Sequence, residues 1–106
     1  MAAVKIYQAA NARLIEIWEY TEERWGAEQA DRYIRELVIT AQALPDRRRS
    51  WRPVRHRSVK EFFYVRHRHH YIFFRSLKQG NVGVVSILHE SMDIPSRLRE
   101  DAEVQN

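Results

Sequence analysis

Histidines that could bind a metal ion concentrate in the second half of the chain. His67 and His69 alternate along the sequence, His70 follows directly, and His89 ends a later apolar run. On a strand, residues two apart point to the same face, so His67 and His69 could approach one ion together. However, the chain has no Cys and no HExxH-type motif, and the neighbouring Arg residues repel cations. We therefore expect no metal site and no other cofactor.

RNA cleavage is the second chemistry that these residue types allow. Cutting a phosphodiester through the 2′-hydroxyl requires an acid, a base and cations that stabilise the developing negative charge. Arg66, Arg68 and Arg75 could supply the cations, and His89 could act as the acid or the base. The simpler interpretation places Arg75 at a strand end and His89 beside a sheet. We prefer it, and we assign no catalytic residue.

Other common reactions lack their motifs. No G-x-S-x-G nucleophile elbow accompanies the Ser and His residues, and the three Gly residues form no phosphate-binding loop. Trp51, Phe62, Phe63 and Tyr64 lie among Arg residues, which is one pattern of nucleic-acid binding. Aromatic runs at strand spacing more often form a core, however. Direct binding of nucleic acid by this chain alone is therefore not expected.

The positive charge comes from one middle segment. The whole sequence carries a net charge of +4, yet residues 1–46 carry −3 and residues 76–106 carry −2. Residues 47–75 hold nine Arg and Lys60 against Glu61 alone, which gives this segment +9. Such a field steers an anionic partner, either a nucleic acid or an acidic polypeptide. A solvated basic loop without a specific partner is the alternative.

Composition narrows the class of protein. A chain of 106 residues with 44% apolar residues fits one globular domain, which we expect to span residues 1–101. No apolar run approaches the roughly 20 residues of a membrane span, and the N-terminus lacks a signal-peptide pattern. The absence of Cys suits a reducing compartment. We expect a cytoplasmic protein with no membrane partner.

The elements that must position these residues centre on a predicted β-hairpin from Tyr71 to Met92. An apolar run over residues 71–74 leads to a Gly80-Asn81 turn and a second apolar run over residues 82–88. Residues 62–65 form a preceding strand, with residues 66–69 as a turn or strand end. Together these strands make an antiparallel meander, which a short strand at residues 4–7 joins at one side.

Two amphipathic helices are predicted between the N-terminal strand and the meander. The apolar stripe of the first consists of Leu14, Ile17, Trp18, Thr21 and Trp25. We expect Trp18 and Trp25 to pack in the core or against the hairpin rather than to bind a ligand. The stripe of the second consists of Ala30, Tyr33 or Ile34, Leu37, Ala41 and Leu44. Gly26 separates the two helices and Pro45 ends the second, so they form an antiparallel hairpin.

These elements predict an α+β domain in two layers, in which the helical hairpin covers one face of a single twisted sheet. Residues 46–53 read as a basic connection without periodicity. Pro95 can begin a short C-terminal helix that reaches about Glu100, and residues 102–106 form a frayed tail.

Three ordered motifs resemble a known family. They are Leu14-x-x-Ile17-Trp18-x-Tyr20-Thr21 with Trp25-Gly26-x-x-Gln29-Ala30-x-x-Tyr33, then Tyr71-Ile72-Phe73-Phe74-Arg75, then Ile87-Leu88-His89-Glu90-Ser91-Met92-Asp93. From Val4 to about Leu98 the chain is similar to ParE-type toxins of the RelE/ParE superfamily. The resemblance implies a small α+β fold and the toxin half of a type II toxin–antitoxin pair. RelE-like members of the superfamily cut mRNA on the ribosome, and ParE-like members poison DNA gyrase.

The details of the resemblance favour the ParE side. RelE-like ribonucleases place an Arg and a Tyr, or a His-Tyr pair, near the C-terminal end, whereas no Tyr follows Tyr71 here. Arg residues and Lys60 replace the Lys pair that the family carries in its middle region. One departure is that Gln8-Ala9 stands where the first helix of the family often begins with a Ser/Thr-Pro pair.

The resemblance thus implies a toxin that inhibits DNA gyrase and is neutralised in a hetero-oligomer with a cognate ParD-like antitoxin, whose acidic segment folds onto the chain. We expect partner contacts at Arg66, Arg68, Arg75, His89, Met92 and Asp93. Two alternatives remain open. One is a RelE-like, ribosome-dependent mRNA endoribonuclease that uses Arg75 and His89. The other is an inactive toxin-fold protein that only binds its partner.

Overall fold

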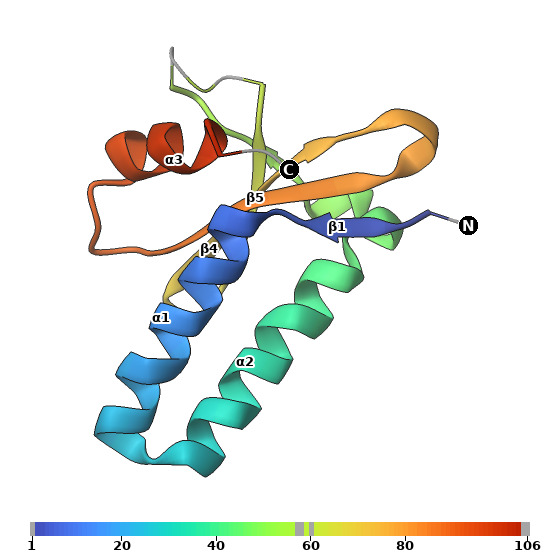
Figure 1. The fold of residues 1–106 in the computed structure, drawn as a ribbon. Helices are drawn as coiled ribbons and strands as arrows, with labels where there is room; N and C mark the ends of the chain where they lie inside the picture. Colours follow the sequence, from blue (N-terminus) through green and yellow to red (C-terminus); the bar gives the residue numbers. More distant parts are fainter. Residues whose placement is uncertain (1, 57–58, 60, 105–106) are drawn as a thin grey trace.

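The computed structural model describes residues 2–56, 59 and 61–104, and it confirms the predicted α+β class (Figure 1). In chain order the helices and strands are β1 (Val4–Ile6), α1 (Gln8–Trp25), α2 (Ala27–Gln42), β2 (Arg52–Pro53), β3 (Phe63–His67), β4 (His70–Ser76), β5 (Val82–His89) and α3 (Ile94–Ala102). Single 3₁₀ turns lie between some of them, namely η1 (Leu44–Asp46), η2 (Arg48–Ser50) and η4 (Lys78–Gly80).

The strands form one sheet in the order β1-β5-β4-β3-β2. The antiparallel pairs β3–β4 and β4–β5 confirm the predicted meander, and β1 joins it at one side by pairing parallel to β5. At the other side the short β2 pairs with the start of β3, where Arg52 faces Tyr64. The His70–His89 pair and the Ser76–Val82 pair therefore mark opposite ends of the β4–β5 ladder.

A β-bulge in this ladder decides which way the end of β5 faces. Phe73 pairs with Ser86 and Phe74 with Val84, so Val85 is an extra residue on β5. One extra residue reverses the alternation of side chains. Val84 and, beyond the bulge, Ile87 consequently belong to the same core cluster. His89 follows Ile87 by two positions and therefore points to the same face, and both residues line a cavity that is described below.

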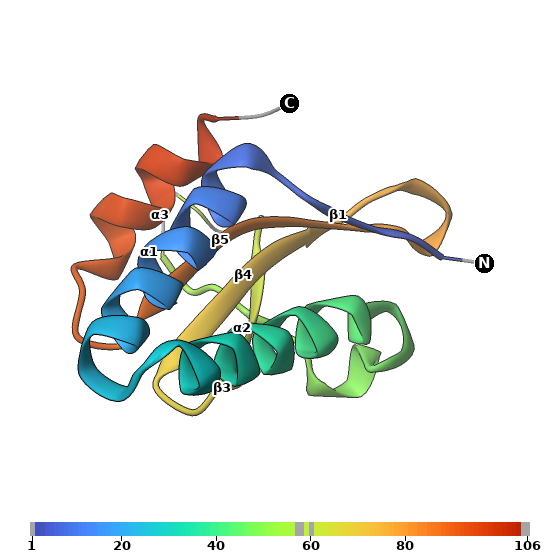
Figure 2. The same ribbon diagram turned by 60° about the horizontal axis from the view of Figure 1, so that its bottom comes forward.

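The two long helices form the predicted antiparallel hairpin on one face of the sheet (Figures 1 and 2). Gly26 joins them at a φ of 93°, which glycine adopts without steric cost, and its N–H donates to the Glu22 carbonyl. The buried helix residues Ala10, Leu14, Leu37, Ala41 and Leu44 pack on one face of the sheet. Most of both predicted stripes is therefore confirmed, although Trp25 is 58% exposed and lies outside the core.

Helix α3 covers the opposite face, so the two-layer prediction is wrong: the sheet has helices on both sides. Leu98 is fully buried in a second core cluster that also contains Phe73 and Leu88. Asp101 is buried as well, because Arg13 donates to its carboxylate from Nε at 2.9 Å and Nη2 at 3.2 Å, and the Ser86 hydroxyl donates at 2.6 Å. The Asp101 hydrogen bond raises the pKa of Arg13 above its ordinary value.

Residues 44–53 are more ordered than the sequence indicated. They form η1, η2 and β2, and Trp51 fixes them because its indole Nε1 donates to the Leu44 carbonyl at 3.0 Å. The turn between β4 and β5 is also wider than the predicted Gly80-Asn81 turn. It includes η4, in which Gln79 has a φ of 62° and Gly80 a φ of 79°, and the Leu77 N–H donates to the Asn81 carbonyl.

At the C-terminus, α3 extends two residues beyond the predicted end, to Ala102, because Asp101 is anchored by Arg13 and Ser86. The predicted frayed tail falls partly on residues 105–106, which lie outside the described residues. None of the helices in the described part of the chain is long and apolar enough to cross a membrane.

Candidate partner-binding site

Four of the five histidines come together at one end of the sheet. His67 and His70 face each other across the β3–β4 turn, and His70 faces His89 across the β4–β5 pair. The rings of His70 and His89 are 5.1 Å apart, and those of His69 and His89 are 6.2 Å apart. The turn itself needs a left-handed residue, which Arg68 provides with a φ of 53°.

His70 lies below the helical hairpin and is held there by Tyr33 of α2. The Tyr33 hydroxyl and His70 Nδ1 share a hydrogen bond of 2.5 Å. Burial and, to a smaller extent, the neighbouring imidazoles lower the pKa of His70 to about 4, so the ring is neutral at pH 7. Burial likewise raises the pKa of Tyr33 to about 12. The Tyr33–His70 pair is therefore uncharged at pH 7, although basic residues surround it.

Two glutamates neutralise much of the charge around the β3–β4 turn. Glu90 contacts Arg66 and also His69, whose Nδ1 lies 2.6 Å away. Glu36 of α2 contacts His67 Nε2 at 3.1 Å and Arg68 Nε at 3.5 Å. The hydrogen bond from His69, together with the Arg66 charge, holds the pKa of Glu90 below its usual range. Each glutamate thus pairs with one Arg and one His of the turn.

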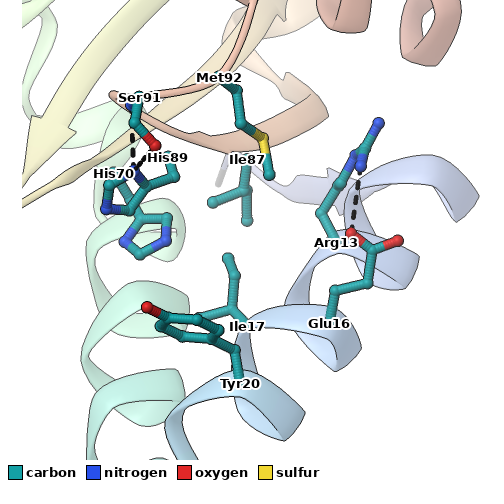
Figure 3. A pocket seen from close by; sticks show the side chains of 9 residues that line it. All are labelled: Arg13, Glu16, Ile17, Tyr20, His70, Ile87, His89, Ser91 and Met92. Atoms are coloured by element: carbon teal, nitrogen blue, oxygen red, sulfur yellow. Dashed lines mark hydrogen bonds and ion pairs between the residues drawn. The ribbon is translucent and has the colours of Figure 1, made fainter.

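A groove runs between the helical hairpin and the ends of β4 and β5. Its first part is a cavity of about 340 Å³ lined by Arg13, Glu16, Ile17, Tyr20, His70, Ile87, His89, Ser91 and Met92 (Figure 3). Its second part is a cavity of about 290 Å³ lined by Tyr20, Thr21, Trp25, Gln29, Arg32, Tyr33, Glu36, Arg68, His69, His70 and His89. Tyr20, His70 and His89 line both parts, so the two cavities are neighbours, and we refer to them together as the groove.

Exposed apolar side chains surround this groove. Tyr20 is 52% exposed, Trp25 58% and Met92 39%, and each lines one or both cavities. The sequence predicts that Trp25 packs in the core or against the hairpin, but it is the last residue of α1, lies at the turn between the two helices and is largely exposed. Large apolar residues that gather at a cavity mark a surface for a partner. The groove can therefore accept apolar side chains beside polar contacts.

Most of the predicted contact residues lie at this end of the sheet. The Ser91 N–H donates to His89 Nδ1 at 3.0 Å, which orients the imidazole in the groove wall (Figure 3). Met92 follows in the same loop, and Asp93 precedes the first residue of α3. Arg66 and Arg68 are close by but engaged with Glu90 and Glu36.

Arg75 is the exception among the predicted contact residues. It pairs with Gly83 at the far end of the ladder, where its Nη2 donates to the Tyr7 hydroxyl at 3.4 Å. Five strand positions separate Arg75 from His70, the partner of His89, which corresponds to about 17 Å. The structure therefore does not bring Arg75 and His89 together around one phosphate.

Sequence reasoning missed several residues of the groove. Tyr33 was assigned to the core stripe of α2, and Glu36 and Glu90 were not singled out as partners for the basic turn. Tyr20 offered the clearest signal, because it lies off the apolar stripe of α1 and an aromatic residue there must be exposed. Among the described residues, no group of three or more His, Asp or Glu side chains is placed to hold a metal ion.

Solved structures of two toxin–antitoxin systems contain chains with the same fold. The structure superimposes on a chain of the chromosomal ParDE toxin–antitoxin system from P. aeruginosa with a TM-score of 0.71 at 18% identity, covering 84% of this chain and 96% of that one. It also superimposes on a chain of the toxin–antitoxin complex RelBE2 from Mycobacterium tuberculosis, with a TM-score of 0.63 at 16% identity, covering 87% and 97%. Both likenesses concern the fold.

Sequence similarity is more specific. The family model of the ParE toxin of the type II toxin–antitoxin system parDE matches residues 4–94. The toxin ParE1 of Mycobacterium tuberculosis is 37% identical over 93 residues, which cover 85% of this chain and 91% of that toxin. This chain belongs to the ParE toxin family of type II toxin–antitoxin systems.

Proposed function

We propose that the chain is a toxin that inhibits DNA gyrase by binding it, without breaking bonds of its own, and that it acts in the cytoplasm. We further propose that a cognate ParD-like antitoxin silences it in a hetero-oligomer. Membership of the ParE family supports the proposal. The contacts remain those expected from the sequence, with Arg66, Arg68, His89, Met92 and Asp93 near the groove and Arg75 as a separate, distant contact.

The observation that carries this proposal is the groove with its exposed apolar rim. Tyr20, Trp25 and Met92 present large apolar surfaces beside cavities that can hold side chains of a partner. Aromatic and Met residues around such a depression are the usual anchors of protein–protein interfaces. An antitoxin segment that folds on binding can place its apolar residues here and its acidic residues on the surrounding Arg side chains.

The experiment that tests the gyrase target is a supercoiling assay. Purified toxin, added to DNA gyrase, relaxed plasmid and ATP, should inhibit supercoiling or accumulate cleaved DNA, and antitoxin added in equal amount should restore activity. If saturating, folded toxin leaves gyrase unaffected, gyrase is not the target. If expression of the folded protein also leaves growth unaffected, the inactive binding protein becomes the better interpretation.

The antitoxin contact is tested by its association kinetics. The +9 segment should accelerate the encounter with an acidic partner, so the association rate should fall steeply as salt is added, while the dissociation rate changes less. Stopped-flow fluorescence of the toxin's Trp residues provides the readout. An association rate that does not change with salt would contradict an electrostatically guided partner.

A ribosome-dependent ribonuclease is the second candidate, because two imidazoles lie in one groove. His70 and His89 are 5.1 Å apart between ring centres, and Arg68 lines the same groove. A His89→Gln variant and the parent protein should be compared for mRNA cuts in a translating extract. Cuts that the parent makes and the variant loses would favour this function, and the absence of any cuts by the parent would remove it.

A further inference from the structure

A second group of positive charges lies on the connection between α2 and β3. We call it the Arg strip, and it comprises Arg47, Arg48, Arg49, Arg52 and Arg55. All five residues are exposed and lie on the connection from α2 to β3, which includes η2 and β2. Arg48 Nη2 donates to the Gly80 carbonyl at 3.4 Å, which places Arg48 beside the β4–β5 turn, whereas Arg52 pairs with Tyr64 on the edge of the sheet.

The Arg strip differs from Arg66 and Arg68 in the pairing of its charges within the described part of the chain. None of its guanidinium groups forms an ion pair with a carboxylate in the described part of the chain. Arg66 and Arg68, in contrast, both contact glutamates. Arg57 and Lys60, which the charge of +9 also includes, lie outside the described residues. Exposed like charges that follow one another along one connection favour an anionic ligand.

The strip offers charge but no apolar anchor. Its one aromatic residue, Trp51, packs against Phe63 and Phe74 at 5.3 and 4.9 Å between ring centres. The guanidinium of Arg48 covers the Trp51 ring at 4.5 Å. The large apolar residues that are exposed in the described chain all belong to α1, α2 or the region after β5. An amphipathic acidic peptide, which needs apolar contacts as well as charge, would find none here.

The chemistry of the strip therefore selects among anionic ligands. Single-stranded nucleic acids are bound through aromatic side chains that stack on bases, and the Trp51 face is already covered. Duplex DNA presents about one negative charge per 1.7 Å of axis and is bound through its phosphates by Arg and Lys alone. We propose that the Arg strip binds the phosphate backbone of duplex DNA, independently of base sequence.

This site is separate from the groove, and its occupation does not depend on the proposed inhibition of gyrase. It reverses the expectation that the chain alone does not bind nucleic acid. That expectation considered aromatic stacking, whereas the strip works through unpaired charge. If both proposals hold, the strip and the groove could engage DNA and protein at the same time, because none of the five Arg residues of the strip lines the groove.

The test is fluorescence anisotropy of a labelled duplex of about 20 base pairs, titrated with the purified chain over a range of salt concentrations. Neutralisation of three to five phosphates predicts a slope of log K against log salt between about −3 and −4.5. The variant Arg47→Gln/Arg48→Gln/Arg49→Gln should weaken binding at least tenfold, and its slope should be shallower by about 2 to 3.

A matched control separates the strip from net charge. Arg24→Gln/Arg32→Gln/Arg35→Gln removes the same charge from exposed positions on the helical hairpin, and it should change affinity by less than about threefold. Arg48 covers the Trp51 ring, so its replacement could also disturb local packing. A second strip variant, Arg49→Gln/Arg52→Gln/Arg55→Gln, leaves this contact intact and should also bind the duplex more weakly. Circular dichroism confirms that each variant folds.

Three results would overturn the proposal. The first is equal loss of DNA by the strip variants and the helix variant, which would indicate a general charge effect. The second is tighter binding of a polyglutamate peptide than of the duplex, which would indicate an acidic protein ligand. The third is tighter binding of a single-stranded RNA of the same length, which would indicate recognition of exposed bases.

Discussion

The β3–β4 turn beside the groove and the Arg strip differ in whether their positive charges form ion pairs. At the groove end, Glu36 and Glu90 pair with the Arg and His residues of the β3–β4 turn, and the remaining surface is largely apolar. The Arg strip, in contrast, is exposed and has no acidic partner in the described part of the chain. The net charge of a segment therefore does not show where its electric field is strong, because ion pairs with acidic residues elsewhere in the chain cancel part of the charge.

We expect the groove and the Arg strip to contribute to binding in different ways. An apolar groove with neutralised surroundings contributes affinity and depends on shape, since apolar burial is insensitive to salt. A strip of unpaired Arg residues contributes long-range attraction that falls as salt is added. A protein that holds one macromolecule and approaches another can use both. The following changes weaken or sharpen this difference, beginning with the largest effect.

Removal of the Asp101 carboxylate should destabilise the wall of the groove most. Asp101→Ala leaves the Arg13 guanidinium, which lines the first cavity, largely buried without its main partner. Loss of one member of such a pair costs about 3 kcal/mol in the free energy of unfolding, measured by urea denaturation. Glu100→Ala, which removes only the exposed contact to Arg97, should cost less than about 0.5 kcal/mol. Equal costs would show that the Arg13–Asp101 pair does not support the fold.

Truncation of the exposed Trp25 should affect binding without affecting stability. Trp25→Ala should weaken the complex with the antitoxin at least tenfold, about 1.4 kcal/mol, because this side chain lines the groove. Its free energy of unfolding should change by less than about 0.5 kcal/mol, because the ring is 58% exposed. Ile39→Ala, at a 61% exposed position of α2, is the matched control and should bind normally. Unchanged affinity of the Trp25 variant would place the antitoxin elsewhere.

Acidification should weaken the groove end through His70. The pKa of His70 is lowered to about 4 by burial, whereas an unfolded His titrates near 6.5. The unfolded chain therefore binds the proton first, so this contribution to stability is complete above about pH 6.5 and is lost between about pH 6.5 and 4. Allowing for solvent screening at this half-buried site, the loss is about 1–2 kcal/mol.

The variant His70→Gln isolates this effect, because Gln stays neutral and can still bond to the Tyr33 hydroxyl. Urea unfolding between pH 7 and 4 should show a smaller loss of stability for the variant than for the parent. The other titratable groups that face His70 stay in both proteins, namely Tyr33, His67, His69, His89 and Glu90. Identical pH profiles would exclude His70 as the source.

The smallest effect should come from removing the carboxylate that pairs with Arg66 beside the groove, and it concerns the rate of association with a partner. Glu90→Gln releases Arg66 and His69 from their shared carboxylate and makes this end more like the Arg strip. The association rate with an acidic partner at low salt should rise roughly twofold. Glu103→Gln, an exposed position on the last residues after α3, changes the net charge equally and should have less effect. A larger increase for Glu103→Gln would contradict local control of the field.

The sequence anticipated most of the fold because its signals are local. Helical spacing in residues 8–44, Gly26 between the helices and the apolar runs of the meander each specify an element from neighbouring residues. The errors concern contacts between distant residues. Trp25 has the right spacing for the core but lies at the turn of the hairpin, and α3 became a core element only through Leu98 and Asp101.

The candidate site was anticipated only as a set of residues. The sequence named His89, Met92, Arg66 and Arg68, which lie at one end of the sheet, but it also named Arg75, which lies at the other. It could not assign Glu36 and Glu90 as the partners of the basic turn, because the segments lie far apart in the chain and the pairing depends on side-chain geometry.

By itself, the sequence determined the helical hairpin, the meander and a basic middle segment, because propensity, periodicity and charge are properties of neighbouring residues, and its ordered motifs indicated the family by resemblance. Only the tertiary structure decided which face His89 occupies, since the extra residue Val85 reverses the alternation of β5. It also decided which positive charges are paired and which are free, because ion pairs join residues that only the packed sheet and helices bring within reach.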